Sequence, residues 1–559
     1  SNIIYSIHED NSGILWIGTY TGGLNKYNRQ QDRFTYYRHD PDHPNSLSGN
    51  LVFPICVDVN GIVWIGTYGD GLERLNPVTG RCTHYRHDPG NPDSLSSDDI
   101  YSILPDQNGN LWVGTSRALD RLDLRTGKFT HFRPASKEQD EFSLSALPVY
   151  VIYEEGDGTL WFGTSSGLDQ FEPLTDTFIH YRPNADENEN QVIALAEDGN
   201  GRLWVGTFGG GLHRFNESGK GYTSYYNDPQ DPTTLANNSV FSIHEDRRGN
   251  LWLGTGGGLD LYDTVTGTFI HKTEKDGLPN NVIYGILEDD AGDLWMSTNN
   301  GISRFDPIDA RFRNFTASDG LQGNDFNMFA SALSPRGEMY FGGNNGVNSF
   351  LPLDITDNTF IPPVVLTSLS QEGAPIETGE QLQYVREITL TWPQNQFEFE
   401  FAALAYDQPS DNQYAYMLEN FDSDWNNIGT SRDGRYTNLP GGFYTLLLNG
   451  TNSDGIWSDS PLRIRVTVIP PIWQTTWFRI LLGLVLVAVI AGGYRLRLDS
   501  VQRRNRELAD LVRERTSALD KRTTEVEALY QADEKILRTV SVNQVFQTLV
   551  DVSRDILQA

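Results

Sequence analysis

Cysteine is almost absent from this sequence, because Cys56 and Cys82 are the only two among 559 residues. Two thiols exclude a disulfide-stapled scaffold and a zinc site built from clustered cysteines. We interpret both as small apolar side chains that fill space within one repeat. The sequence also lacks an initiator methionine and a signal peptide, and it begins within a repeat, which we interpret as an N-terminal truncation.

Basic residues are scarce relative to acidic ones. The chain has 43 Lys and Arg against 74 Asp and Glu, a formal net charge of −31. From Arg495 onward 12 basic residues meet 11 acidic ones, so the excess negative charge lies in residues 1–494. An acidic body repels phosphate polyanions, which argues against nucleic-acid binding and favours neutral or cationic ligands.

Several catalytic signatures are missing. All ten histidines lie at or before His271, so the C-terminal segment has no histidine that a kinase would phosphorylate. The sequence has no Gly-rich phosphate loop and no Gly-x-Ser-x-Gly motif. We therefore expect no enzyme activity within this chain, no cofactor and no metal site.

Long hydrophobic runs are absent except for one, the 15 residues between Arg479 and Arg495. A spanning helix usually needs about 20 apolar residues, but Trp473 and Trp477 provide an aromatic belt that extends the run. An arginine cluster follows at once, which places that end inside the cell. We predict a single pass, with residues 1–473 extracytoplasmic and residues 497–559 cytoplasmic; a buried core helix is the alternative.

A repeat fills the first 352 residues. Each copy holds an acidic turn, a Leu-Trp-Ile-Gly-Thr-like strand and a Gly-Gly-Leu-like turn, and its tryptophan recurs every 43 to 49 residues: Trp16, Trp64, Trp112, Trp161, Trp204, Trp252 and Trp295. An eighth, degenerate copy at 337–352 has Tyr340 instead. Each copy contains four short segments of β-type composition, which in the first are Ile4–His8, Leu15–Thr19, Leu24–Asn28 and Phe34–Arg38. Four strands per period of this length are typical of a β-propeller blade.

Eight copies permit one eight-bladed ring, or a seven-bladed ring preceded by the remnant of another ring. The truncated start favours the second arrangement. We therefore predict a mainly β fold: a seven- or eight-bladed β-propeller, a β-sandwich, one transmembrane helix and a cytoplasmic coiled coil. The expected boundaries are 1–352 for the propeller, 353–385 for a connector, 386–470 for the sandwich, 474–496 for the transmembrane helix, 497–533 for the coiled coil and 534–559 for the start of a further domain.

The coiled coil rests on a heptad track that includes Leu508, Val512, Leu519 and Val526. Polar residues at other seam positions weaken it, so it is either an imperfect linker or a stalk that switches register. We expect a homodimer through the sandwich and this stalk. Trp473, Trp477 and the four seam residues are the candidate signal-relay residues.

Ligand candidates are the positions that vary where the repeat is otherwise constant. The constant Trp, Thr and Gly residues are better explained as packing between blades. The residue after the constant threonine is in turn Tyr20, Tyr68, Ser116, Ser165, Phe208, Gly256 and Asn299. Aromatic faces beside polar groups suit sugars, and Arg117 adds a cation. We expect a small-molecule or oligosaccharide ligand to contact Tyr20, Tyr68, Arg117, Phe208 and Asn299.

The sequence motif around each tryptophan resembles that of the two-component regulator propeller family, over residues 1–352. The segments QYAYMLENFDSDW (413–425), RYTNLPGGFYTL (435–446), DGIWS (454–458) and PPIW (470–473) resemble the Tyr-rich β-sandwich that follows such propellers. The last residues, ALYQADEKILRTVSVNQVFQTLVDVSRDIL, are similar to the opening of a GAF domain.

The resemblance implies the sensor half of a bacterial inner-membrane receptor, whose output is a histidine kinase or less often a diguanylate cyclase. It also implies recognition of oligosaccharides by some members. Two rival readings stay open: a membrane-anchored propeller hydrolase or lyase, which needs an acid/base pair at the channel mouth, and an adhesion module without signalling.

Overall fold

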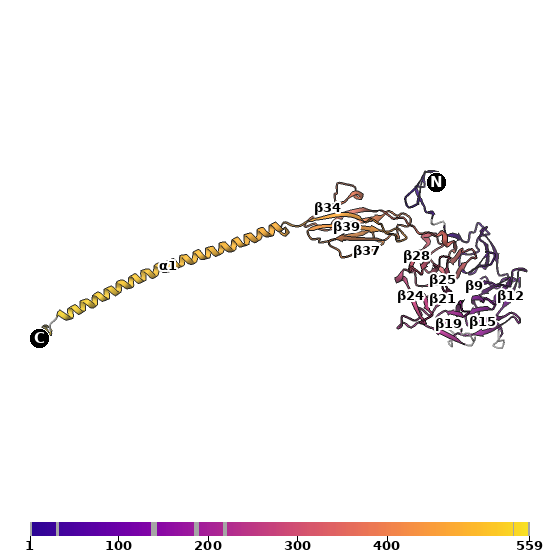
Figure 1. Cartoon of the computed structure of the whole chain (residues 1–559), viewed down its shortest axis with the longest axis horizontal. Coiled ribbons are helices and arrows are strands. Elements are labelled where there is room, and N and C mark those ends of the chain that lie inside the picture. The colour runs from indigo at the N-terminus through magenta and orange to yellow at the C-terminus, as the bar shows by residue number, and fades with distance from the viewer. Residues whose placement is uncertain are drawn as a thin grey trace.

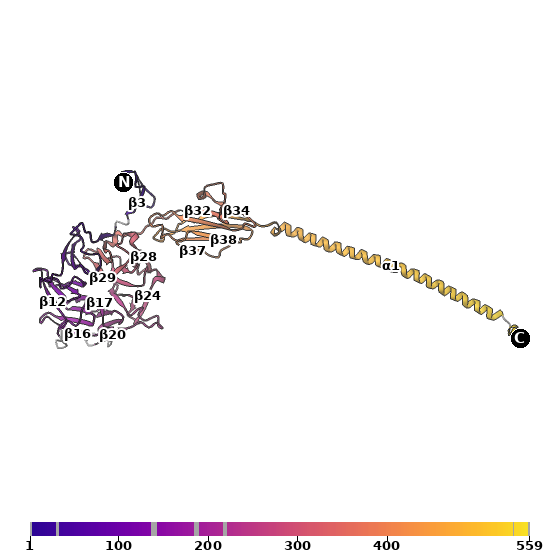
Figure 2. The same cartoon turned by 180° about the vertical axis from the view of Figure 1, so that it is seen from behind.

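The computed structural model describes residues 3–29, 33–135, 142–183, 189–215, 221–539 and 542–556. It has three parts in chain order: a β-propeller, a β-sandwich and one long helix that projects away from both (Figures 1 and 2). The chain end marked N lies beside the propeller, and the C-terminus lies at the far end of the helix.

Seven sheets of four strands each form the propeller blades. Within the first three blades the strands are β5 (Val52–Val57), β6 (Val63–Thr67), β7 (Leu72–Asn76), β8 (Arg81–Tyr85); β9 (Ile100–Pro105), β10 (Asn110–Thr115), β11 (Leu119–Asp123), β12 (Lys128–Phe132); and β13 (Val149–Glu154), β14 (Leu160–Thr164), β15 (Gly167–Glu172), β16 (Thr177–Tyr181). The next three comprise β17 (Val192–Glu197), β18 (Leu203–Thr207), β19 (Leu212–Phe215), β20 (Tyr222–Tyr225); β21 (Val240–Glu245), β22 (Leu251–Thr255), β23 (Leu259–Asp263), β24 (Thr268–Lys272); and β25 (Ile283–Glu288), β26 (Leu294–Thr298), β27 (Gly301–Asp306), β28 (Arg311–Phe315).

The seventh blade closes the ring with a strand from the other end of the propeller sequence. It contains β29 (Phe326–Leu333), β30 (Met339–Gly343) and β31 (Gly346–Phe350), and its outer strand is β4 (Thr35–Tyr37), which pairs with β31. The inner strand β29 then packs beside the inner strand β5 of the first blade. The arrangement of a seven-bladed ring with a preceding remnant is thereby confirmed, and the fourth strand expected in the first repeat belongs to the last blade.

The remnant is a separate three-stranded sheet of β1 (Ile4–Glu9), β2 (Leu15–Thr19) and β3 (Leu24–Tyr27). It lies outside the ring, near the end of the sandwich that faces the propeller (Figures 1 and 2). Trp16 packs edge-on against Tyr406 of the sandwich at 5.6 Å between ring centroids, and Lys26 Nζ donates to the Asp407 carbonyl at 2.5 Å.

The repeat motif is explained by packing between neighbouring blades. Trp64 of the first blade is buried against Leu111 and Val113 of the second, and burial of one such side chain contributes about 1.5–3 kcal/mol. Gly66 has no space for a Cβ, because Ile100 of the next blade approaches it. The constant threonines of the ring are fully buried, and Thr67 Oγ1 donates to the Gly71 carbonyl at 2.8 Å.

The sandwich consists of two sheets around one core. The first sheet contains β32 (Val364–Gln371), β33 (Ala374–Pro375), β35 (Phe397–Ala403) and β38 (Asp433–Tyr436), and the second contains β34 (Glu387–Thr391), β36 (Tyr414–Glu419), β37 (Asn426–Gly429), β39 (Gly442–Gly450) and β40 (Leu462–Ile469). Residues 364–375, expected to be part of a connector, are thus strands of the sandwich. The reason is that β32 buries Val364, Leu366 and Leu369 in the sandwich core.

One uninterrupted helix, α1 (Thr476–Thr539), covers both the expected transmembrane helix and the expected coiled coil. Among the described residues it is the one helix long and apolar enough to cross a membrane, which gives the chain a single-pass layout. A second helix, α2 (Val542–Ile556), follows it.

Candidate functional site

The structure brings four of the five candidate ligand residues to one end of the ring. Tyr68, Arg117, Phe208 and Asn299 each lie just after the second strand of a blade, at the end where the inner strands begin. All four are exposed. Tyr20 is exposed too, but it belongs to the separate sheet β1–β3, where it packs against Tyr5. Tyr20 is therefore not part of the same site.

A set of inner-strand aromatics, which the sequence analysis missed, lies beside these residues. We call it the aromatic collar; its members are Phe53, Tyr101, Tyr150, Phe241, Tyr284 and Phe329. Tyr68 contacts Phe53 and Tyr101 at centroid distances of 5.9 and 6.1 Å, and Phe208 contacts Phe241 at 6.2 Å. The sequence did carry a pattern that marks the collar, because five of its members occupy the second position of an inner strand.

Phe329 joins the collar from a distant blade. Its ring stacks on Tyr150 at 6.4 Å with an interplanar angle of 29°, although β29 is in the seventh blade and β13 in the third. The pairing register of β29 with β30 shifts between Phe326 and Ser331, and Phe329 has φ +63°. A bulky residue in this region of φ is strained, and such strain concentrates at functional sites. The bulge in β29 thus places an aromatic ring across the channel mouth.

Polar groups surround the collar. Ser116 Oγ lies 2.8 Å from Ser97 Oγ and donates to Asp99 at 3.2 Å. Burial and the neighbouring Tyr68 hydroxyl raise the pKa of Tyr101 to about 12, so its hydroxyl stays protonated and can donate a hydrogen bond. Among the described residues the Arg117 guanidinium has no ionic partner. Flat apolar faces beside hydrogen-bonding groups fit a polar small molecule with apolar faces.

Four blades share a buried carboxylate–histidine pair, which we call the latch. The pairs are Glu73–His84, Asp120–His131, Asp169–His180 and Asp260–His271. In the second blade Asp120 is fully buried, accepts from His131 Nδ1 at 2.6 Å and also accepts from the Ser96 backbone N–H at 2.7 Å. His131 Nε2 lies 3.0 Å from the Pro92 carbonyl. The latch therefore bonds the loop that connects two blades, on the mouth side of the ring, to the second of those blades.

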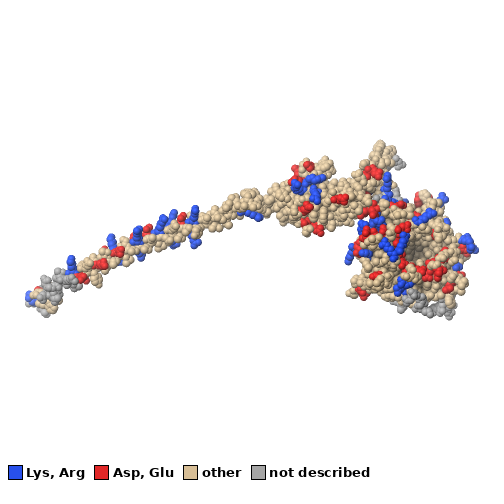
Figure 3. All heavy atoms as spheres, in the orientation of Figure 1, with Lys and Arg blue, Asp and Glu red and all other residues tan. Residues whose placement is uncertain are grey.

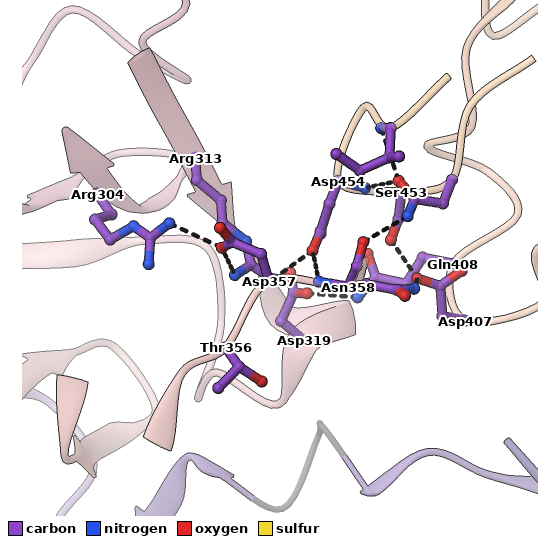
Figure 4. A network of polar contacts seen from close by, with 12 residues as sticks. Arg304, Arg313, Asp319, Thr356, Asp357, Asn358, Asp407, Gln408, Ser453 and Asp454 are labelled. Atoms are coloured by element: carbon purple, nitrogen blue, oxygen red, sulfur yellow. Dashed lines mark hydrogen bonds and ion pairs between the residues drawn. The ribbon is translucent and has the colours of Figure 1, made fainter. Parts of the chain in front are cut away.

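A second polar cluster joins the propeller to the sandwich, and we call it the joint (Figure 4). Arg304 and Arg313 of the sixth blade both donate to Asp357, at 2.8 and 2.6 Å. Arg313 also pairs with Asp454 of the sandwich at 2.9 Å, and Gln408 of the sandwich donates to Asp319 at 2.5 Å. Both arginines of the ring are thus bonded to the linker, and Arg313 is bonded to the sandwich as well.

The joint is largely shielded from water. The side chains of Arg313 and Asp454 are only 16% and 14% exposed, and burial raises the pKa of Asp454 and of Asp319. Asp407 accepts from Asn358 Nδ2 at 2.7 Å and from Ser453 Oγ. A cavity of about 20 Å³, room for one water molecule, lies among these groups. Removing one partner here would leave a buried charge uncompensated.

The candidate relay residues all lie on or beside α1 and face outward. Trp473 packs against Trp392 of the sandwich, with centroids 4.8 Å apart. Trp477 and the seam residues Leu508, Val512, Leu519 and Val526 are each more than half exposed. An apolar seam on a single exposed helix has no packing partner within the described chain.

Comparison with known proteins shows what the propeller and the sandwich are similar to. The family model described as two component regulator propeller matches residues 1–21, 94–117, 143–166, 186–209, 234–257 and 277–300, and the Y_Y_Y domain model matches residues 405–468. The crystal structure of the extracellular domain of the hybrid two component system BT3049 from B. thetaiotaomicron is 28% identical, with a TM-score of 0.70. That alignment covers 84% of this chain and 62% of the other.

A curated relative, Histidine kinase P4 from Formosa agariphila, is 27% identical over 172 residues. The match covers 27% of this chain and 12% of that protein. This chain thus spans less than two thirds of either relative's length. The propeller thus carries segments that match the two component regulator propeller model, and the sandwich carries a segment that matches the Y_Y_Y domain model. Together they are similar to the extracellular domain of a hybrid two-component system, and one long apolar helix follows them.

Proposed function

We propose that this chain is the extracytoplasmic sensing and membrane-relay portion of a bacterial two-component sensor, embedded in the inner membrane. Its ligand is a carbohydrate or another small polar molecule, bound at the channel mouth. The observation that carries the proposal is the aromatic collar, which lies beside the exposed Tyr68 and Phe208. Arg117 lies at the same end of the ring, and its guanidinium has no ionic partner in the part of the chain that the structure describes. Pyranose C–H faces pack on aromatic rings while their hydroxyls need hydrogen-bond partners.

A route from the mouth to the joint supports a signalling role. Phe329 in the collar and Asp319 in the joint belong to one short stretch, which begins with the connection between the sixth and seventh blades. A ligand that displaces Phe329 would move this stretch against Gln408 of the sandwich. Binding drives such a change only if the ligand prefers one arrangement, with coupling of about 1–3 kcal/mol in typical cases.

Beyond the membrane the proposed output is a histidine kinase, as the name of the curated relative suggests. Two copies of α1 would pair through Leu508, Val512, Leu519 and Val526. Cysteine crosslinking tests this pairing: Leu508→Cys and Leu519→Cys should crosslink readily between copies, whereas Asp510→Cys, off the seam, should not. Equal crosslinking at all three positions would contradict the dimer.

Binding to a panel of neutral and acidic oligosaccharides, followed by calorimetry, tests the ligand site. Tyr68→Ala with Phe208→Ala should weaken binding of any hit at least tenfold, because both exposed rings are lost. Tyr384→Ala removes an exposed tyrosine from the sandwich and serves as the control. Unchanged affinity in the double variant would remove the channel mouth as the site.

A further inference from the structure

Three loops of the sandwich converge where α1 begins. Trp392 N–H donates to the Ile469 carbonyl at 3.3 Å, which joins loop 392–396 to the end of β40. Leu439 N–H donates to the Asn395 carbonyl at 3.0 Å, and Asn395 Nδ2 donates to the Leu439 carbonyl at 2.8 Å. Gly441 lies so close to Pro470 that a side chain would not fit. Loops 392–396, 438–443 and 469–478 therefore form one surface, which we call the sandwich foot.

The foot is apolar and uncharged in a strongly acidic molecule. Its exposed side chains include Trp392, Phe443, Ile469, Ile472 and Trp473, of which Phe443 is 74% exposed. None of the three loops contains Asp, Glu, Lys or Arg, although the chain carries a net charge of −31. Glu372, which accepts from Gln396 at 3.2 Å, stands at the edge. Figure 3 shows neutral residues predominating from this junction along the first part of the helix.

The length of the apolar run determines how near the foot lies to lipid. The 15 residues between Arg479 and Arg495 rise about 22 Å as a helix, while the hydrocarbon core of a bilayer is about 30 Å thick. The residues before Arg479 must therefore sit in the membrane interface, where tryptophan is favoured. Because Trp473 is 4.8 Å from Trp392, an interfacial Trp473 brings the foot into the interface too.

We propose that the sandwich foot is a lipid-docking surface that rests in the headgroup region of the bilayer crossed by α1. This inference rests on the membrane crossing in the proposed function. An uncharged aromatic surface fits the interface of a zwitterionic membrane and needs no anionic lipid. Docking would fix the tilt of the sandwich, so that movement at the joint is passed to α1 and not lost by swinging of the domain.

The test uses the full chain in phosphatidylcholine vesicles that contain a spin-labelled lipid. In a Cys56→Ala, Cys82→Ala background, single cysteines at three exposed positions carry an environment-sensitive fluorophore: Gln394→Cys in the foot, Leu486→Cys in α1 and Ser410→Cys at the propeller end of the sandwich. We expect lipid quenching at 394 several-fold above that at 410, and strong quenching at 486. A further Trp392→Asp change should remove the quenching at 394, whereas Trp392→Phe should retain it.

Each remaining outcome overturns one statement. Quenching at 486 with equal, weak quenching at 394 and 410 would show that the sandwich stands clear of the membrane, which contradicts docking but leaves the single pass intact. No quenching at 486 would contradict the membrane crossing itself. Shielding of 394 from aqueous iodide without lipid quenching would show that protein, such as a second copy of the chain, covers the foot.

Discussion

At the scale of single residues, the latch links histidine chemistry to the stability of the ring. The hydrogen bond that His131 donates to Asp120 raises the pKa of His131, and the bond that His271 donates to Asp260 raises the pKa of His271. A histidine whose pKa is higher in the folded state stabilises the fold fully below about pH 6.5, the unfolded value. That contribution is lost as the pH rises through the folded pKa.

We therefore predict that the free energy of unfolding falls as the pH rises above about 6.5 and that His131→Asn with His271→Asn flattens this slope. Each substitution should also cost about 1–3 kcal/mol at pH 6, because a buried carboxylate loses a partner. Urea unfolding between pH 5.5 and 9 measures both effects. His43→Asn, in an exposed loop, is the control, and an unchanged slope in the double variant would contradict the latch.

Phe329 allows a test of stored strain at the channel mouth. Phe329→Ala removes the stack on Tyr150 but keeps a Cβ at φ +63°. Phe329→Gly removes the stack and also relieves the backbone, a difference of about 1 kcal/mol. We predict that thermal unfolding finds the glycine variant more stable than the alanine variant. The reverse order would show that the backbone at this position is unstrained.

Sequence alone predicted some of these residues and missed others for physical reasons. Tyr68 and Phe208 emerged from the repeat because they vary where their neighbours are constant. The two residues of each latch pair are 11 positions apart, as Asp120 and His131 are, so the sequence also carries a signal for the latch. Phe329 had no such signal, because its position depends on a bulge and on a contact across the ring.

At the scale of elements, the joint holds two folded parts together through Arg313. Its side chain bonds Asp357 and Asp454 and is largely buried. Arg313→Met therefore leaves Asp454 without its cation, whereas Asp357 keeps its bond to Arg304. Loss of one partner of a buried ion pair costs about 3–5 kcal/mol. We predict faster hydrogen exchange in residues 405–408 and 452–456, with the inner propeller strands unchanged.

The matched control for this prediction is Arg311→Met, two residues earlier on β28. Arg311 is 77% exposed and pairs only with the nearby Asp309 among the described residues. An exposed pair contributes little, so this variant should exchange like the unchanged chain. Equal exchange in both variants would mean that Arg313 does not hold the sandwich to the ring.

The blade strands were predictable from their period, whereas their closure was not. Each copy carries its own alternation of apolar and polar residues and its own turns, so β2 begins and ends as expected. The pairing of β4 with β31 joins residues about 310 positions apart, and no local pattern encodes such a partner. The contacts of the joint also connect distant segments, so no local pattern predicts them.

At the scale of the whole molecule, charge and hydropathy divide the chain into two sides. All of the net negative charge precedes Arg495, and the arginines after Tyr494 begin the other side. The proposed ligand site, the joint, the proposed docking surface of the sandwich foot and one continuous helix follow one another from the propeller to the end of the helix (Figure 1). Relay of a signal along this path requires that α1 crosses the bilayer.

Cysteine labelling of the full chain in spheroplasts tests this requirement most directly. Ser460→Cys lies on the exposed end of the sandwich and Asp510→Cys on α1 beyond the arginines, both in a Cys56→Ala, Cys82→Ala background. We predict that a membrane-impermeant maleimide labels position 460 in intact spheroplasts and labels position 510 only after lysis. Labelling of both positions before lysis, or of neither, would contradict the account.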